Sequence, residues 1–276
     1  MKYVLFNPFS ANGECTKKSE EYQKTLECSK IIDITDITDY KNFFANLDKT
    51  DEIIICGGDG TLNRFVNNID GIDIDNEIYY VPMGTGNDFY ADVTQETGKP
   101  ILINDYIKNL PVVTVKGKKY KFINGVGYGI DGYCCEVGDK LHAEGKAANY
   151  TAIAIKGLLF HFKPVCATVT VDGVEHTYKK VWIAPTMFGR RYGGGMIPTP
   201  EQIRGGEELS LMMFHGSGKL KTLMIFPSIF KGEHVKKEKY VTVLKGKNIT
   251  VKFDSPRALQ IDGETVLDVE EYTANV

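Results

Sequence analysis

The chain has 276 residues, which at roughly 150 residues per domain predicts one large or two modest domains. Apolar residues make up 42% of it and charged residues 25%, so the chain can bury a core and overall disorder is excluded. The 33 basic and 36 acidic side chains give a formal charge of −3, and there is no run of five like charges. No nucleic acid partner is therefore expected, and the sequence offers no polybasic footprint for anionic lipid.

The cysteine spacing and the hydropathy indicate a compartment. The six cysteines show neither C-x-x-C spacing nor a nearby histidine at zinc-finger spacing, which favours reduced thiols. The first apolar run is too short for a signal peptide, and no apolar stretch reaches the roughly 18 residues of a membrane span. We expect a soluble, cytoplasmic protein that can still touch a membrane surface.

The first hundred residues alternate between strand and helix patterns. Apolar runs at 4–6, 53–56 and 78–81 predict short strands. Between the second and third run, an amphipathic helix is predicted by the spacing of Leu62, Phe65, Val66 and Ile69. A strand, a helix and a strand in this order predict a parallel sheet in an α/β domain, which we place at residues 1–120.

The remaining residues, 121–276, read as a mainly antiparallel β domain. Apolar positions alternate over 165–171, and Asp172-Gly173 predicts a hairpin turn. Further strands are expected at 181–184, 209–214, 240–244, 249–253 and 258–261, with one helix around 147–160. The last residues are allowed to return to the first domain, and the cleft between the domains is the default ligand site.

The first glycine cluster, Gly57 to Asn63, lies between a predicted buried strand and the amphipathic helix. Such a turn can present helix N-terminal N–H groups to a phosphate, or it can be a plain tight turn with Thr61 or Asp59 as N-cap. A carboxylate in a phosphate cradle would repel the ligand, so Asp59 favours a bound Mg²⁺ or a hydroxyl group. No Walker sequence occurs.

A second cluster, Pro82 to Phe89, follows the next strand with the same features. Two glycine loops on adjacent strand ends can hold one nucleotide from both sides. The alternative is an Asn or Asp N-cap on a short helix, but the occurrence of two such loops makes coincidence less likely. A third cluster, at 124–132, lacks the helical context of a dinucleotide fingerprint.

Two later motifs are open to more than one interpretation. Arg190 and Arg191 beside Gly193 to Gly195 can clamp a phosphate or lie on a solvated loop. Asp262-Gly263-Glu264 has the form of a type I′ hairpin turn.

Taken in order, these motifs resemble the diacylglycerol kinase catalytic domain family, and within it the small soluble bacterial lipid kinases. The resemblance covers the glycine loops, the opening Asn7-Pro8-x-Ser10, the Gly194-Gly195-Met196 segment and Asp262-Gly263-Glu264. It implies a domain like that of NAD kinases, a C-terminal β-sandwich-like domain, and ATP with Mg²⁺ in the cleft. It also implies a lipid substrate at the membrane surface and a role in phospholipid biosynthesis, and it leaves a homodimer open.

The resemblance also assigns residues. Asp262 would orient or deprotonate the lipid hydroxyl, with Glu264 as the other candidate base, and Asp88 and Asp131 would support the site. With Asp59, the catalytic set is Asp262, Glu264 and Asp59. The nucleotide set is Asn7, Pro8, Ser10, Thr35, Gly57, Gly58, Asp59, Gly60, Thr61, Asn63, Gly84 and Thr85. Thr35 is preferred there over Thr38 as the threonine at the start of the next helix.

The sequence departs from the family at two places. Ala11 stands where the opening motif ends in glycine. The loop at 200–209 lacks the Asp-Asp-Gly that holds a structural Mg²⁺ in the family, so either Glu207 or Glu208 substitutes or that metal is absent. No metal ligand is therefore assigned.

The main hypothesis is an ATP-dependent kinase for diacylglycerol or a related lipid. The alternatives are a kinase for a soluble nucleotide such as NAD, and a nucleotide-binding protein with little or no turnover. The apolar stretches 147–162 and 223–230 can serve the core or a membrane contact.

Overall fold

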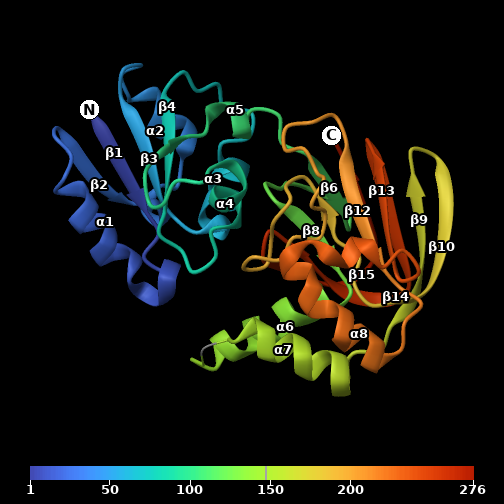
Figure 1. Cartoon of the computed structure of the whole chain (residues 1–276). Coiled ribbons are helices and arrows are strands. Elements are labelled where there is room, and N and C mark those ends of the chain that lie inside the picture. Colours follow the sequence, from blue (N-terminus) through green and yellow to red (C-terminus); the bar gives the residue numbers. More distant parts are fainter. Residues whose placement is uncertain (147) are drawn as a thin grey trace. The chain divides into compact units, whose positions relative to one another are not determined.

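The computed structural model describes residues 1–146 and 148–276, which form two compact units, Met1–Leu110 and Pro111–Val276 (Figure 1). Each unit has its own sheet. The sequence predicts the domain boundary near residue 120. In the structure the second unit begins at Pro111, because strands β6 (Val112–Val115) and β7 (Lys118–Lys121) pair within its sheet.

The first unit is the predicted α/β unit. Its sheet has the order β2-β1-β3-β4-β5, and every pair is parallel except β4 with β5. The strands are β1 (Lys2–Phe6), β2 (Ser29–Asp33), β3 (Glu52–Gly57), β4 (Glu77–Pro82) and β5 (Ile101–Leu102). The three runs expected to be strands lie in β1, β3 and β4, so that part of the prediction is confirmed.

Helices cover both faces of this sheet. On one face, Tyr22 near the end of α1 and Leu26 just after this helix pack against Val4 and Ile54. On the other face the ring of Phe65 from α3, the predicted amphipathic helix, contacts rings of α2. The helices are η1 (Ser10–Gly13), α1 (Cys15–Gln23), η2 (Ile34–Asp36), α2 (Tyr40–Ala45), α3 (Asp59–Asn68), α4 (Asp88–Val93) and α5 (Asn104–Ile107).

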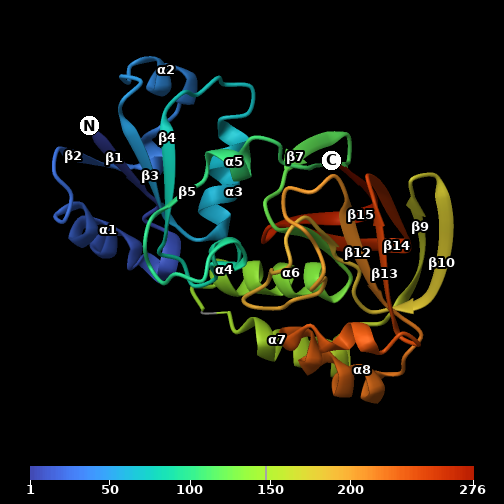
Figure 2. The same cartoon turned by 45° about the horizontal axis from the view of Figure 1, so that its top comes forward.

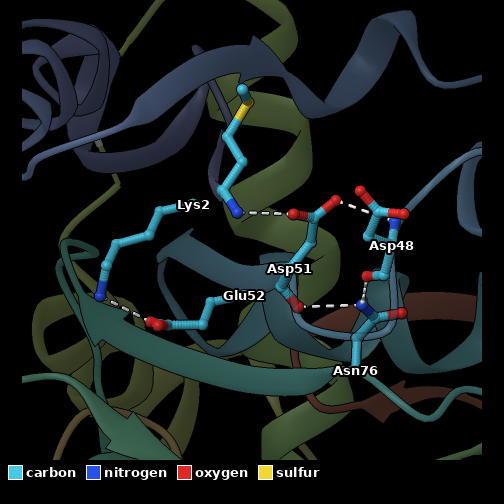
Figure 3. A network of polar contacts seen from close by, with 6 residues as sticks. Lys2, Asp48, Asp51, Glu52 and Asn76 are labelled. Atoms are coloured by element: carbon cyan, nitrogen blue, oxygen red, sulfur yellow. Dashed lines mark hydrogen bonds and ion pairs between the residues drawn. The ribbon is translucent and has the colours of Figure 1, made fainter.

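The strand order makes the carboxyl edge of the sheet the expected ligand side. The chain moves from β1 outward to β2, then returns to β3 on the other side of β1, and ligands of open α/β sheets bind at such a reversal, beyond the carboxyl ends of the strands. The amino ends are tied by polar contacts instead (Figure 3). There the Met1 nitrogen donates to Asp51 at 2.6 Å, Lys2 pairs with Glu52, and Asn76 donates to the carbonyls of Asp48 and Asp51.

The second unit is an antiparallel β structure, as predicted. The sheet runs β13-β12-β11-β8-β14-β15-β6-β7, and β9 pairs with β10 and β14. The long strand β14 pairs with β9 through its first half and with β8 through its last three residues. The remaining strands are β8 (Gly125–Tyr128), β9 (Val165–Val171), β10 (Val174–Val181), β11 (Thr186–Met187), β12 (Leu209–Phe214), β13 (Val241–Gly246), β14 (Asn248–Ile261) and β15 (Glu264–Asn275).

Several expectations for this unit need adjustment. The strands expected at 249–253 and 258–261 are one continuous strand, β14. Instead of a strand at 181–184, β10 ends at Val181 and Ile183 forms isolated bridges. The last strand, β15, pairs with β14 and β6 inside the second unit.

The helices of the second unit form a layer that the sequence only partly indicates. The expected helix around 147–160 appears as α7, continued by the π-helical turn η3, while Ala147 lies outside the described residues. Helices α6 and α8 were not expected. The layer consists of α6 (Ile130–Ala143), α7 (Tyr150–Lys156), η3 (Gly157–His161), α8 (Lys219–Ile225), η4 (Phe226–Lys231) and η5 (Glu233–Lys236). No helix in the described part of the chain has the length and apolar character needed to cross a membrane.

Candidate functional site

In the first unit the two glycine loops touch through bare backbone. A Cβ added to Gly84 would lie 2.8 Å from the Gly58 nitrogen and nearer still to its Cα. The Gly57 carbonyl accepts hydrogen bonds from the N–H groups of Met83, at 2.8 Å, and Gly84, at 3.1 Å. A Cβ at Gly84 would thus collide with the Gly58 backbone, and one at Gly58 would lie only 3.1 Å from the Gly84 Cα, so the loops after β3 and β4 form one surface.

Asp59 joins the same two loops through its side chain. Its carboxylate accepts the N–H of Asp88 at 2.8 Å and the N–H of Phe89 at 2.9 Å. These N–H groups belong to the first turn of α4, where a helix lacks internal acceptors. Asp59 therefore caps a helix that begins in the neighbouring loop.

The side chain of Asn87 does not act as the N-cap that was one interpretation of this loop. It precedes α4, but its side chain forms no cap bond and instead exchanges hydrogen bonds with the backbone of Gly84. The cap comes from Asp59, a residue far away in sequence. The two clusters noted separately in the sequence are thus one structure.

A small polar cluster lies beside this surface, at the carboxyl end of β1. The Thr61 hydroxyl accepts a hydrogen bond from the Asn7 amide at 3.1 Å and shares one with the Ser10 hydroxyl at 2.8 Å. Thr61 belongs to the first turn of α3, so the opening motif and the first glycine loop meet here. Asn63, two residues further along α3, is buried, and its carbonyl accepts a hydrogen bond from the Asn67 amide.

The other residues of the expected nucleotide set lie at the same edge of the sheet. Thr35 follows β2, and both its N–H and its hydroxyl donate to Asp33. Pro8 is half-buried and Thr85 is exposed. A Cβ added to Gly60 would meet no heavy atom of the described chain within 4 Å.

This edge has the features of an anion site. Helix α3 starts at Asp59 directly after a glycine, so its N-terminal N–H groups and its dipole favour a negative group there. The open side of Gly60 lets a ligand approach the backbone. The residues present therefore fit the phosphates of a nucleotide.

In the second unit Asp262 and Gly263 form the turn between β14 and β15. Both have positive φ, +46° and +98°, as the predicted type I′ turn requires. The Asp262 carboxylate accepts three backbone N–H groups, from Ile123 at 2.5 Å, Asn124 at 2.8 Å and Gly125 at 2.9 Å. The carboxylate is therefore fixed against the segment that leads into β8.

Arg204 holds the same segment from another side, although no sequence motif indicates this contact. Its guanidinium donates to the Ile123 carbonyl and, at 2.8 Å, to the Asn124 side-chain oxygen. The sequence drew attention to Arg190 and Arg191 because they adjoin glycines. Arg204 stands in an irregular loop whose partners are distant in the chain, so no local pattern identifies it.

Glu264 and Asp131 differ in their surroundings. Glu264 opens β15 and is exposed, whereas Asp131, in the first turn of α6, is buried and accepts a hydrogen bond from the Tyr192 hydroxyl. Burial raises the pKa of Asp131 to about 7, although the bond from Tyr192 acts in the opposite direction. Tyr192 pairs with Met196 across the three glycines 193–195, all with positive φ.

The loop at 200–209 does not fit a structural Mg²⁺. Glu207 is exposed and forms an ion pair with Lys247 at 2.8 Å, which lowers its pKa, and Gln202 fills the interior of the loop with hydrogen bonds to backbone carbonyls. Across residues 1–146 and 148–276 no group of three His, Cys, Asp or Glu side chains is placed to hold a metal ion. Glu207 thus does not replace the missing aspartates.

Comparison with known proteins agrees with this arrangement. A model of the diacylglycerol kinase catalytic domain matches residues 2–113, and a model of the YegS C-terminal NAD kinase beta sandwich-like domain matches residues 124–273. A diacylglycerol kinase of Mycobacterium tuberculosis is 25% identical over 265 residues, covering 90% of this chain and 84% of the relative. A diacylglycerol kinase of Bacillus subtilis is 24% identical over 229 residues, covering 80% and 73%.

A solved structure shows the same fold. The crystal structure of a diacylglycerol kinase from Bacillus anthracis superposes with a TM-score of 0.62 at 18% identity, covering 99% of this chain and 93% of that one. The resemblance drawn from the motifs is confirmed. The chain belongs to the family of bacterial lipid kinases that combine a diacylglycerol kinase catalytic domain with a YegS-type C-terminal domain.

Proposed function

We propose that the protein is an ATP-dependent lipid kinase that transfers the γ-phosphate to a hydroxyl of diacylglycerol or a related lipid. The observation that carries this proposal is the joined surface of Gly58 and Gly84 at the carboxyl edge of a parallel sheet, where Asp59 links the two loops by capping α4. Family membership favours a lipid as the acceptor. The curated relatives named diacylglycerol kinase support diacylglycerol as the first substrate to test.

The nucleotide side needs only binding and positioning. Phosphoryl transfer passes through a loose transition state, so catalysis depends on placing the phosphates and neutralising their charge. We assign the phosphates to the glycine loops and to the polar cluster of Asn7, Ser10 and Thr61. ATP enters as its Mg²⁺ complex, which supplies the neutralising charge.

On the acceptor side we assign to Asp262 the role of accepting the proton of the lipid hydroxyl. The hydroxyl oxygen attacks the γ-phosphorus, the bond to the β–γ bridging oxygen breaks, ADP leaves, and the hydroxyl proton passes to the carboxylate. In a loose transition state this proton leaves late, so a carboxylate in a fixed position matters more than a strong base. Three N–H groups fix Asp262 in this way, whereas Glu264 is an exposed, longer side chain.

The test is phosphate transfer from ATP to diacylglycerol in detergent micelles, followed by mass spectrometry. Asp262→Asn should lower kcat by about a hundredfold or more, while Glu264→Gln, the matched control, should keep most of the activity. The reverse order would move the proton acceptor to Glu264. Conversion of NAD, or tight ATP binding without phosphorylation of any lipid in a total extract, would overturn the proposal.

A further inference from the structure

The helical layer of the second unit exposes large apolar side chains on one surface, which we name the docking face. Three of them are mostly exposed, Phe160 by 72%, Leu220 by 77% and Met224 by 74%. Leu220 and Met224 are four residues apart on α8, so they lie on the same side of that helix. The docking face consists of Ile155, Phe160, Leu220, Met224 and Phe230.

The same helices bury their opposite sides, so the docking face is firmly supported. Ile153 and Leu158 of α7 and η3, and Ile225 and Ile229 of α8 and η4, belong to one buried apolar cluster with Trp182. The two apolar stretches for which the sequence allowed either a core or a membrane role therefore each have one buried side and one exposed side. The helices are packed through their buried sides, so the apolar side chains of the docking face are exposed although the helices are in their packed positions.

The two halves of the docking face are held together. The Lys219 ammonium at the start of α8 donates to the Leu159 carbonyl in η3 at 3.0 Å. Figures 1 and 2 show α7 and α8 next to each other in both views. Phe160, which follows Leu159, therefore lies on the same part of the unit as α8.

The two segments that carry the docking face have basic side chains but no acidic ones. Residues 148–171 and 209–232 contain no Asp or Glu, although the whole chain has 36 of them and a net charge of −3. Both segments carry lysines, all of them exposed. They are Lys156, Lys163, Lys219, Lys221 and Lys231.

We propose that the docking face binds the surface of an anionic phospholipid bilayer, with Phe160, Leu220 and Met224 inserted between headgroups and the five lysines among the lipid phosphates. Apolar side chains within a basic rim are the features of an interfacial membrane contact. A second copy of the chain fits this face poorly. In a two-fold dimer each patch meets itself, so the five lysines of each copy would face the same five.

The choice of a bilayer as the occupant rests on the proposed lipid kinase activity, but the contact can be tested without it. The measurement is cosedimentation with vesicles of phosphatidylcholine alone and of equal parts phosphatidylcholine and phosphatidylglycerol. The protein should bind the mixed vesicles at least about tenfold more tightly, and added salt should weaken binding because the lysine contribution is screened. Equal binding to both vesicles would overturn the proposal.

Variants test the face itself. Leu220→Ser combined with Met224→Ser should weaken binding to mixed vesicles about tenfold or more, because two inserted apolar side chains are lost. The matched control is Val174→Ser, at a position 59% exposed on β10, which should leave binding unchanged. All these positions are exposed, so the thermal midpoint should not move. Unchanged vesicle binding in the double variant, or a change in oligomeric state instead, would refute the docking face.

Two further readouts separate this proposal from the kinase proposal. The double variant should still phosphorylate a short-chain diacylglycerol in solution, since no residue of the assigned nucleotide or acceptor site has changed. If the unmodified protein binds mixed vesicles through this face but phosphorylates no lipid, the docking face stands and the kinase proposal fails. If it phosphorylates short-chain lipid but binds no vesicle, the docking face fails and the kinase proposal stands.

Discussion

The carboxylate of Asp59, at the start of α3, accepts the backbone N–H of Asp88 at 2.8 Å and thereby caps a helix that starts in another loop. Asp59→Ala removes this bond and the one to Phe89. We expect a loss of about 2 kcal/mol in the free energy of unfolding, measured by urea denaturation, together with a loss of ATP binding. Asp73→Ala, which removes an exposed carboxylate of the same unit, is the control. A stable Asp59→Ala protein with full phosphate transfer to lipid would contradict both assignments.

Gly84→Ala and Gly60→Ala should separate packing from ligand approach. A Cβ at position 84 meets the Gly58 backbone, so the loops must move apart and the protein should lose about 1–3 kcal/mol of stability. A Cβ at position 60 meets nothing in the described chain, and alanine favours the helix, so stability should rise by up to about 1 kcal/mol.

ATP titration then tests the nucleotide assignment. Gly60→Ala should bind ATP more weakly despite its greater stability, because the added methyl group occupies space that the ligand needs. Normal ATP affinity in Gly60→Ala would remove Gly60 from the nucleotide site.

Ala11 has a positive φ of +53°, a conformation that alanine adopts only with strain. In the family motif that this segment resembles, the position is a glycine. Ala11→Gly should therefore raise the free energy of unfolding by about 0.5 kcal/mol, after the greater freedom of glycine in the unfolded chain is subtracted. Ala91→Gly, in the exposed interior of α4, should instead lower it by about 1 kcal/mol. If both variants changed the free energy of unfolding in the same direction, the strain at Ala11 would be contradicted.

The buried Asp131 should make stability depend on pH. Its pKa is raised to about 7 in the folded protein, above the usual value near 4 of the unfolded chain. As the pH rises from about 4 to about 7, the unfolded state loses a proton that the folded state keeps, so this group destabilises the fold by about 1.4 kcal/mol per pH unit.

Asp131→Asn removes that dependence. Denaturation at several pH values should show the variant gaining stability relative to the unmodified protein from about pH 4 to about pH 7, with a constant difference above that. The Tyr192 hydroxyl can still donate to an Asn oxygen, so Tyr192→Phe is a separate test of the bond alone. A difference that does not change with pH would show that Asp131 is not a buried acid.

Local patterns predicted what local chemistry determines. The strands β1, β3 and β4, the helix stripe at Leu62 and Phe65, and the turns at Asp172 and Asp262 all follow from residues next to one another. Helix α6 was missed because Gly132 and Gly138 lower its helix propensity. Both glycines are required by residues distant in sequence, since Gly132 packs against the Ala258 carbonyl and Gly138 against Tyr150.

The candidate site shows the same division. Motif resemblance selected Asp59 and Asp262, but their hydrogen-bond partners come from another loop or another strand. Asp59 was expected to face a metal ion or a hydroxyl, and its carboxylate accepts two backbone N–H groups of α4. Arg204 was missed because its partners, Ile123 and Asn124, are brought to it only by the fold.

The bare contact of Gly58 with Gly84 also has a thermodynamic consequence. Two loops that are already locked together need not be ordered when a ligand arrives, so binding a nucleotide would sacrifice little conformational entropy in this unit. Even a modest number of contacts to the phosphates would then yield useful affinity. The glycines here act as close-packed spacers that make the surface rigid before any ligand binds.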